Sequence, residues 1–143
     1  MSSAPTSSPA SIQIQWKLPS TCSLKAHDHD GSLLPLIYYT DYARGRLGQY
    51  DPTKRQITEW PSPGGSGSRP YGIAITPDGA VWYSESGLNP NTIVQFDPRT
   101  ESFASWPIPS GGGVVRNMVS TPTGDLYIAC SGVNKVGIVK VER

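Results

Sequence analysis

The residues best suited to catalysis or metal binding are a histidine–aspartate run near the N-terminus and two acidic side chains further along the chain. The run HDHD spans residues 27–30, and the two carboxylates are Asp41 and Glu85. An imidazole titrates near neutral pH, so His27 could remove a proton from a carbon beside a carbonyl group. A carboxylate could then hold a divalent cation that stabilises the resulting enolate.

Each of these features also has a plainer interpretation. The run 27–30 could be a solvated surface loop, or it could bind a metal ion adventitiously. Asp41 and Glu85 could accept backbone N–H groups at the ends of strands instead of holding a cation. The sequence leaves these alternatives open.

The candidate residues belong to a sequence that repeats itself. The stretch 82–98, WYSESGLNPNTIVQFDP, parallels the stretch 38–52, YYTDYARGRLGQYDP. The stretch 121–141 parallels the part of the chain that begins at residue 76. Tryptophans recur with these repeats at spacings of 44 and 46 residues, at Trp16, Trp60 and Trp106. A period of this length indicates a repeat architecture.

Each repeat is built from short strands joined by tight turns. Ile73 and Ile75 alternate with smaller or polar residues, and the following segment 77–79, PDG, has the composition of a turn. Val81, Trp82 and Tyr83 suit the pleated surface of a strand. This pattern predicts strands near residues 12–18, 37–41, 45–51, 56–60, 71–76, 80–86, 92–97, 102–106, 114–120, 124–130 and 135–141.

Four short strands per repeat predict an all-β protein built from β-propeller blades. We expect a flexible tail at 1–10, followed by a half-propeller (11–143) of three four-stranded blades at about 11–62, 63–108 and 109–143. The last repeat has only three strands, and the strand expected at 12–18 matches the missing fourth.

Three blades are too few to close a ring, because propellers have 4–8. We therefore expect a homodimer in which each chain lends its N-terminal strand to the other's last blade, closing a six-bladed ring. The alternative is that the chain is a fragment of a longer propeller.

Composition narrows the range of partners. The chain has 143 residues and a net charge of +1, so no strong field favours nucleic acid or a membrane surface. Its N-terminus lacks the pattern of a secretory signal, which predicts a cytoplasmic protein, or a secreted or periplasmic one if a signal peptide was removed.

Cys22 and Cys130 are expected to be free thiols, with Cys130 a small buried residue. The four tryptophans are expected to pack blade against blade.

The repeats resemble those of the virginiamycin B lyase (streptogramin B lyase) family. The resemblance is carried by RPYGIAITPDGAVWYSESG, GRLGQYDP, ITEWPSP and SGVNKVGIV, and it covers nearly all of the chain from Ile12 onward. It implies a propeller that opens a cyclic depsipeptide by elimination, using a histidine base and glutamates that hold Mg²⁺. The family's propeller is a longer single chain, so this sequence departs from it in the number of blades per chain.

The resemblance also implies positions for the functional residues. The position of the histidine base falls on His27, Tyr71 and Arg116 in the three repeats. The carboxylate position 14 residues later falls on Asp41, Glu85 and Cys130, so only the first repeat pairs a histidine with an acid. The candidates are His27, Tyr71 and Arg116 for catalysis, Asp41 and Glu85 for Mg²⁺ or Ca²⁺, and Arg69, Asn89 and Asn117 for substrate binding.

Three functions are consistent with this sequence. The favoured one is a metal-assisted carbon–oxygen lyase that opens a cyclic ester-containing peptide or a lactone by elimination. The second is a lactone or ester hydrolase of the six-bladed propeller type. The third is a non-catalytic propeller that binds a small molecule or peptide at the mouth of its channel.

Overall fold

The computed structural model describes residues 25–27 and 33–142, and strands dominate this part of the chain. The first blade contains β3 (Ile37–Asp41), β4 (Arg46–Asp51) and β5 (Gln56–Pro61). The middle blade contains β6 (Pro70–Ile75), β7 (Val81–Glu85), β8 (Thr92–Asp97) and β9 (Ser102–Pro107). The last blade contains β10 (Val115–Ser120), β11 (Leu126–Cys130) and β12 (Lys135–Val139), with the short 3-10 turn η1 (Ser131–Val133) before β12.

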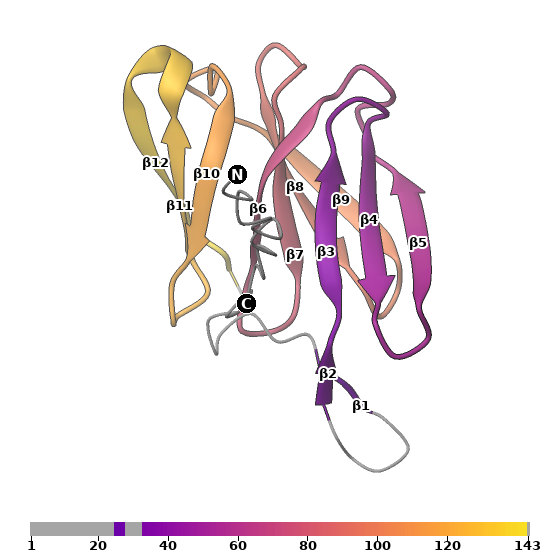
Figure 1. Ribbon diagram of the computed structural model, residues 1–143. Helices are drawn as coiled ribbons and strands as arrows, with labels where there is room; N and C mark the ends of the chain where they lie inside the picture. The colour runs from indigo at the N-terminus through magenta and orange to yellow at the C-terminus, as the bar shows by residue number, and fades with distance from the viewer. Residues whose placement is uncertain (1–24, 28–32, 143) are drawn as a thin grey trace, which may run out of the picture.

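The three blades lie side by side in chain order, with β6 between β3 and β10 (Figure 1). Every strand pair within a blade is antiparallel. No helix among the residues described is long and apolar enough to cross a membrane. This arrangement is the partial propeller that the repeats predict.

Matching turns close the outer hairpins of the first two blades. The Asp51 Oδ1 accepts the backbone N–H of Thr53 at 2.9 Å, and the Asp97 Oδ1 accepts that of Arg99 at 2.9 Å. An aspartate side chain that bonds the backbone two residues on imitates a turn and fixes where the strand ends. The repeated Asp-Pro pair therefore sets the same boundary in both blades.

The middle blade contributes to two separate hydrophobic cores because alternate residues of β7 point to opposite faces. Val81 and Tyr83 pack toward the first blade, whereas Trp82 packs toward the last. The ring of Trp60 in the first blade lies 4.7 Å from that of Phe96 in the middle blade. Trp82 stacks on Trp106 of its own blade at 5.7 Å. Tryptophan packing between blades is thus confirmed for Trp60 and Trp82.

The expected strands from residue 37 onward are confirmed to within two residues at each end. The expected strand at 12–18 and Cys22 lie outside the described residues. Cys130 is a free thiol, 1% exposed, as expected.

The first blade departs from the expected four strands, because its described part holds three. The preceding strands β1 (Lys25–His27) and β2 (Leu33–Pro35) form a separate hairpin in which His27 pairs with Leu33. Proline has no N–H to continue a ladder, so β2 ends at Pro35 before β3 begins. In the described chain, β3 therefore pairs with β4 alone.

Candidate functional site

Two tyrosines and two arginines from all three blades gather where β3 ends and where β6 and β10 begin. The Arg69 Cζ lies 5.7 Å from the centre of the Tyr42 ring. The Tyr42 ring meets that of Tyr71 edge to face at 5.7 Å. The Arg116 Cζ lies 5.9 Å from the centre of the Tyr71 ring. We call these four residues the tyrosine–arginine cluster.

The cluster is open to solvent, although its members contact one another. Tyr42 is 45% exposed and Tyr71 is 41% exposed, and both arginines are exposed. A guanidinium over an aromatic face is attracted to the ring and still keeps N–H donors free for a ligand. The cluster therefore offers aromatic surface and positive donors together.

Irregularities at the start of β6 and β10 place Tyr71 and Arg116 in the cluster. The pairing of β6 with β7 shifts register between Pro70 and Ile73, and that of β10 with β11 shifts between Val115 and Asn117. A bulge of this kind leaves a residue outside the ladder and changes the direction of its side chain. Tyr71 and Arg116 lie in these two irregular segments.

The two strands approach closely because of Gly72 and Ser84. A Cβ added at Gly72 would lie 3.0 Å from the carbonyl oxygens of both Val115 and Arg116. The Ser84 hydroxyl donates to the Val115 carbonyl at 2.7 Å, and its oxygen accepts the Gly72 N–H at 3.0 Å. This bridge fixes the start of β6 against the start of β10.

Arg69 is held by its backbone at the other edge of the cluster. Its φ of +50° lies in the left-handed region, which a residue with a Cβ adopts at a cost. The Ser86 N–H donates to the Arg69 carbonyl at 3.1 Å, and the Gly87 N–H donates to the Ser68 carbonyl at 2.8 Å. These two bonds stabilise the bend that brings Arg69 over Tyr42.

Glu85, an expected metal ligand, is 1% exposed and is held by neutral donors. Its Oε1 accepts the Ser62 hydroxyl at 2.5 Å and the Gly64 N–H at 2.7 Å. Its Oε2 accepts the Thr92 hydroxyl at 2.6 Å. Ser62 and Gly64 belong to the loop between the first two blades, so this carboxylate fastens that loop to the end of β7.

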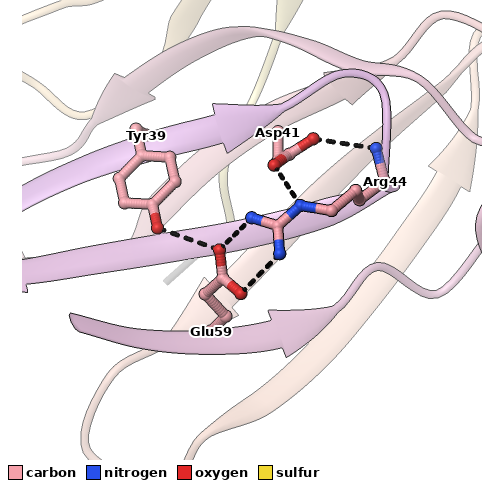
Figure 2. A network of polar contacts seen from close by, with 4 residues as sticks. All are labelled: Tyr39, Asp41, Arg44 and Glu59. Carbon is pink, nitrogen blue, oxygen red and sulfur yellow. Dashed lines mark hydrogen bonds and ion pairs between the residues drawn. The ribbon is translucent and has the colours of Figure 1, made fainter.

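Asp41 stands at the equivalent position in the first blade, but its partner is a cation (Figure 2). Its Oδ1 accepts the Arg44 N–H at 2.8 Å, and its Oδ2 lies 2.7 Å from the Arg44 Nε. The Arg44 guanidinium also binds Glu59, which accepts the Tyr39 hydroxyl at 3.0 Å. Hydrogen bonds from Arg44 lower the pKa of both Asp41 and Glu59.

These contacts bear on the expected metal site. Both oxygens of Asp41 and both of Glu85 already accept hydrogen bonds, and Asp41 faces a guanidinium. Within residues 25–27 and 33–142 there is no group of three or more His, Cys, Asp or Glu that could hold a metal ion. A Mg²⁺ or Ca²⁺ ion at either carboxylate would have to displace hydrogen bonds that are present in this arrangement.

The remaining candidates take no part in the ring and guanidinium contacts that define the cluster. His27 belongs to the β1–β2 hairpin, so strand pairing does not join it to Asp41 as Pro70 is joined to Glu85. Asn89 is exposed in the β7–β8 loop, before a cis bond to Pro90. Asn117 pairs with Ala129 on the last blade. Of the eight candidates, the cluster brings together Arg69, Tyr71 and Arg116.

Tyr42 is the member of the cluster that sequence reasoning missed. It follows Asp41 directly, where the middle repeat has Ser86 after Glu85. A large aromatic residue in place of a serine at the end of the second strand was a visible departure between repeats. The spacing of acids and bases points instead to Asp41, one residue earlier.

Three antiparallel sheets arranged side by side, with cores between their faces, define a partial β-propeller. Comparison with solved structures shows which known propellers this fold is similar to. The selenomethionine-substituted virginiamycin B lyase of Staphylococcus aureus matches with a TM-score of 0.67 and 22% identity, over 83% of this chain and 38% of that one. The chain thus has a virginiamycin B lyase-like propeller fold.

Two further lyase structures are also similar to this chain. A catalytically inactive variant of the Staphylococcus aureus enzyme with quinupristin matches with a TM-score of 0.65 and 22% identity, over 80% of this chain and 36% of that one. A streptogramin B lyase matches with a TM-score of 0.60 and 18% identity, over 88% of this chain and 43% of that one. The chain spans about two fifths of the length of these structures. No family model and no curated protein matches the sequence.

Proposed function

We propose that the tyrosine–arginine cluster binds a small molecule or cyclic peptide that carries an aromatic ring and carbonyl or carboxylate oxygens. The observation that carries this proposal is the unbroken row Arg69, Tyr42, Tyr71 and Arg116, assembled from three blades. An aromatic ring of the ligand packs against the tyrosines. The guanidinium N–H groups donate to its oxygens.

The direct test is a binding titration with quinupristin, the compound present in one of the matching lyase structures. We expect Arg116→Ala and Tyr71→Ala each to weaken binding about tenfold, since one such contact contributes roughly 1–2 kcal/mol. Arg99→Ala is the matched control, because Arg99 is an exposed arginine in the β8–β9 turn outside the cluster. Equal affinity of Arg116→Ala and the unsubstituted chain would contradict the proposal.

A second candidate is ring opening by elimination, which the likeness in fold to virginiamycin B lyase favours over hydrolysis. In this proposal Tyr71 occupies the position of the family's base, and Arg116 stabilises the negative charge that develops on a carbonyl oxygen. Mass spectrometry after incubation with quinupristin distinguishes the outcomes. Elimination gives an isomer of unchanged mass with a new carbon–carbon double bond, whereas hydrolysis adds one water.

The proposal contains no metal-dependent step, because Asp41 and Glu85 are engaged by other donors. Binding of Mg²⁺ or Ca²⁺ stays a prediction from the family resemblance. Calorimetric titration of the purified chain with each metal tests it, and Glu85→Gln is the variant that should abolish any heat of binding at that position.

A further inference from the structure

The two outermost faces of the row of blades carry exposed apolar side chains. On the first blade, the face turned away from the middle blade presents Ile37, 45% exposed, and Ile57, 61% exposed; we call it the leading face. On the last blade, the face turned away from the middle blade is the trailing face. It presents Val119 (59%), Tyr127 (45%), Val136 (76%) and Ile138 (55%).

Residues equivalent to the trailing face are buried one blade earlier. The repeat places Tyr127 at the position of Trp82 and Val136 at that of Ile93. Trp82 and Ile93 are each 3% exposed, because the last blade covers them. The trailing face thus has the composition of a contact between blades but lacks the next blade.

The leading face is the matching half of the same kind of contact. Ile37 stands at the position of Leu126, and Ile57 at that of Phe103. Leu126 is fully buried against the middle blade, and Phe103 packs into the core between the first two blades. A leading face laid on a trailing face therefore repeats the two contacts already present within the chain.

Within the described part of the chain, the last blade has three strands, and its outer strand β12 pairs with β11 alone. Beside it lies a groove of about 670 Å³, lined by residues that include Trp82, Trp106, Ile128 and Val139. Trp106 is 47% exposed over this groove, whereas the equivalent Trp60 rests on Phe96.

We propose that the leading face of a second copy of this chain packs on the trailing face, and that two such contacts close a six-bladed ring with two-fold symmetry. The two faces lie at opposite ends of one chain's row of blades, so they cannot meet within it (Figure 1). A second copy covers both the leading and the trailing face with one kind of contact. The resulting six blades fall within the range of closed propellers.

The test is a pair of complementary charged variants, examined by sedimentation velocity on the full chain. The unsubstituted chain is expected to have the mass of two chains. Ile57→Lys and Val136→Glu each place a charge in both contacts of the ring. Each alone is expected to weaken association about 100-fold or more, because an unpaired charge becomes buried.

Mixing the two variants restores the dimer if the proposal is right. In the mixed ring one contact is unsubstituted, and the other sets the introduced lysine of one copy against the introduced glutamate of the other. Ser105→Lys, at an exposed position on β9 of the middle blade, is expected to associate like the unsubstituted chain. Circular dichroism verifies that each variant is folded.

Three results would overturn the proposal. One is a single-chain mass for the unsubstituted protein at every concentration. Another is failure of the mixture to associate, which would indicate that like faces pair. The third is an assembly of more than two chains.

Discussion

At the scale of single residues, Glu85 has a structural role that can be measured apart from any activity. Its carboxylate is buried and accepts three hydrogen bonds, from Ser62, Gly64 and Thr92. Replacing it by alanine leaves these donors without a partner, which is expected to lower the free energy of unfolding by about 3 kcal/mol. Urea denaturation measures this change.

Two further variants sharpen that prediction. Glu85→Gln retains one acceptor oxygen and is expected to lose less stability than Glu85→Ala. Glu142→Ala, at an exposed position, is expected to change the free energy of unfolding by less than about 0.5 kcal/mol. If Glu85→Ala were as stable as Glu142→Ala, the loop between the first two blades would not depend on this carboxylate.

The network around Arg44 predicts a dependence of stability on pH. Hydrogen bonds from Arg44 lower the pKa of Asp41 and Glu59 in the folded chain. Unfolded carboxyls titrate near about pH 4, so the stabilisation is present above that pH and is lost as the pH falls through the lower, folded pKa values. The unfolded state takes up protons first, which favours unfolding in acid.

Arg44→Ala is expected to remove most of this effect. With no guanidinium to hold them, the two carboxylates return toward their ordinary pKa, and the loss of stability between about pH 5 and pH 3 becomes smaller. Unfolding free energies measured across this range, with Lys135→Ala as an exposed control, test the prediction. An unchanged acid slope in Arg44→Ala would show that the ion pairs are not maintained in solution.

At the scale of elements, glycines allow the loop that enters the middle blade and the loop that enters the last blade to cross the end of the second strand of that blade. A Cβ at Gly87 would lie 2.2 Å from the Gly67 carbonyl oxygen, and one at Gly132 would lie 2.2 Å from that of Gly113. The repeat places Gly87 and Gly132 at equivalent positions. The same close crossing therefore occurs in the middle blade and in the last blade.

Alanine at either position is expected to force the loop away from the strand. We expect Gly87→Ala and Gly132→Ala each to destabilise the chain by roughly 1–3 kcal/mol, as overpacking does. Gly67→Ala is the control, because its Cβ would meet nothing within 4 Å. Thermal unfolding of the three variants makes the comparison, and equal melting temperatures would contradict the close crossing.

At the scale of the whole molecule, closure by a second copy predicts that stability depends on concentration. Association that occurs only in the folded state raises the melting temperature by mass action. We expect a rise of about 2–3 °C for each tenfold increase in chain concentration. Ile57→Lys is expected to abolish this dependence while leaving the fold intact. A melting temperature that is independent of concentration in the unsubstituted chain would argue against self-association.

Much of the fold could be predicted because its determinants are local. The alternation through Ile73 and Ile75, the turn before Val81 and the Asp-Pro turns after β4 and β8 each depend on neighbouring residues alone. The repetition of these signals then specified blades, and the likeness to virginiamycin B lyase structures agrees with that prediction.

The candidate site could be predicted only in part. Arg69, Tyr71 and Arg116 were candidates near the starts of inner strands; Arg116 contacts Tyr71 directly, and Tyr42 joins Arg69 to them. Tyr42 was not expected, and the pairing of His27 with Leu33 was not visible in the spacing. The hydrogen-bond partners of Asp41 and Glu85 also differ, although the two residues stand at equivalent positions of the repeat.

By itself the sequence determined where strands begin and end and that the units are blades, because backbone geometry and turn chemistry act over a few residues. Only the tertiary structure decided which side chains form the tyrosine–arginine cluster. That outcome depends on bulges at the starts of β6 and β10 and on the bridge from Ser84. The tertiary structure also decided the partners of the two carboxylates. The loop after the first blade donates hydrogen bonds to Glu85, whereas the nearby Arg44 donates to Asp41. Apart from the contact between Asp41 and Arg44, these contacts join residues far apart in the chain, and local patterns do not encode them.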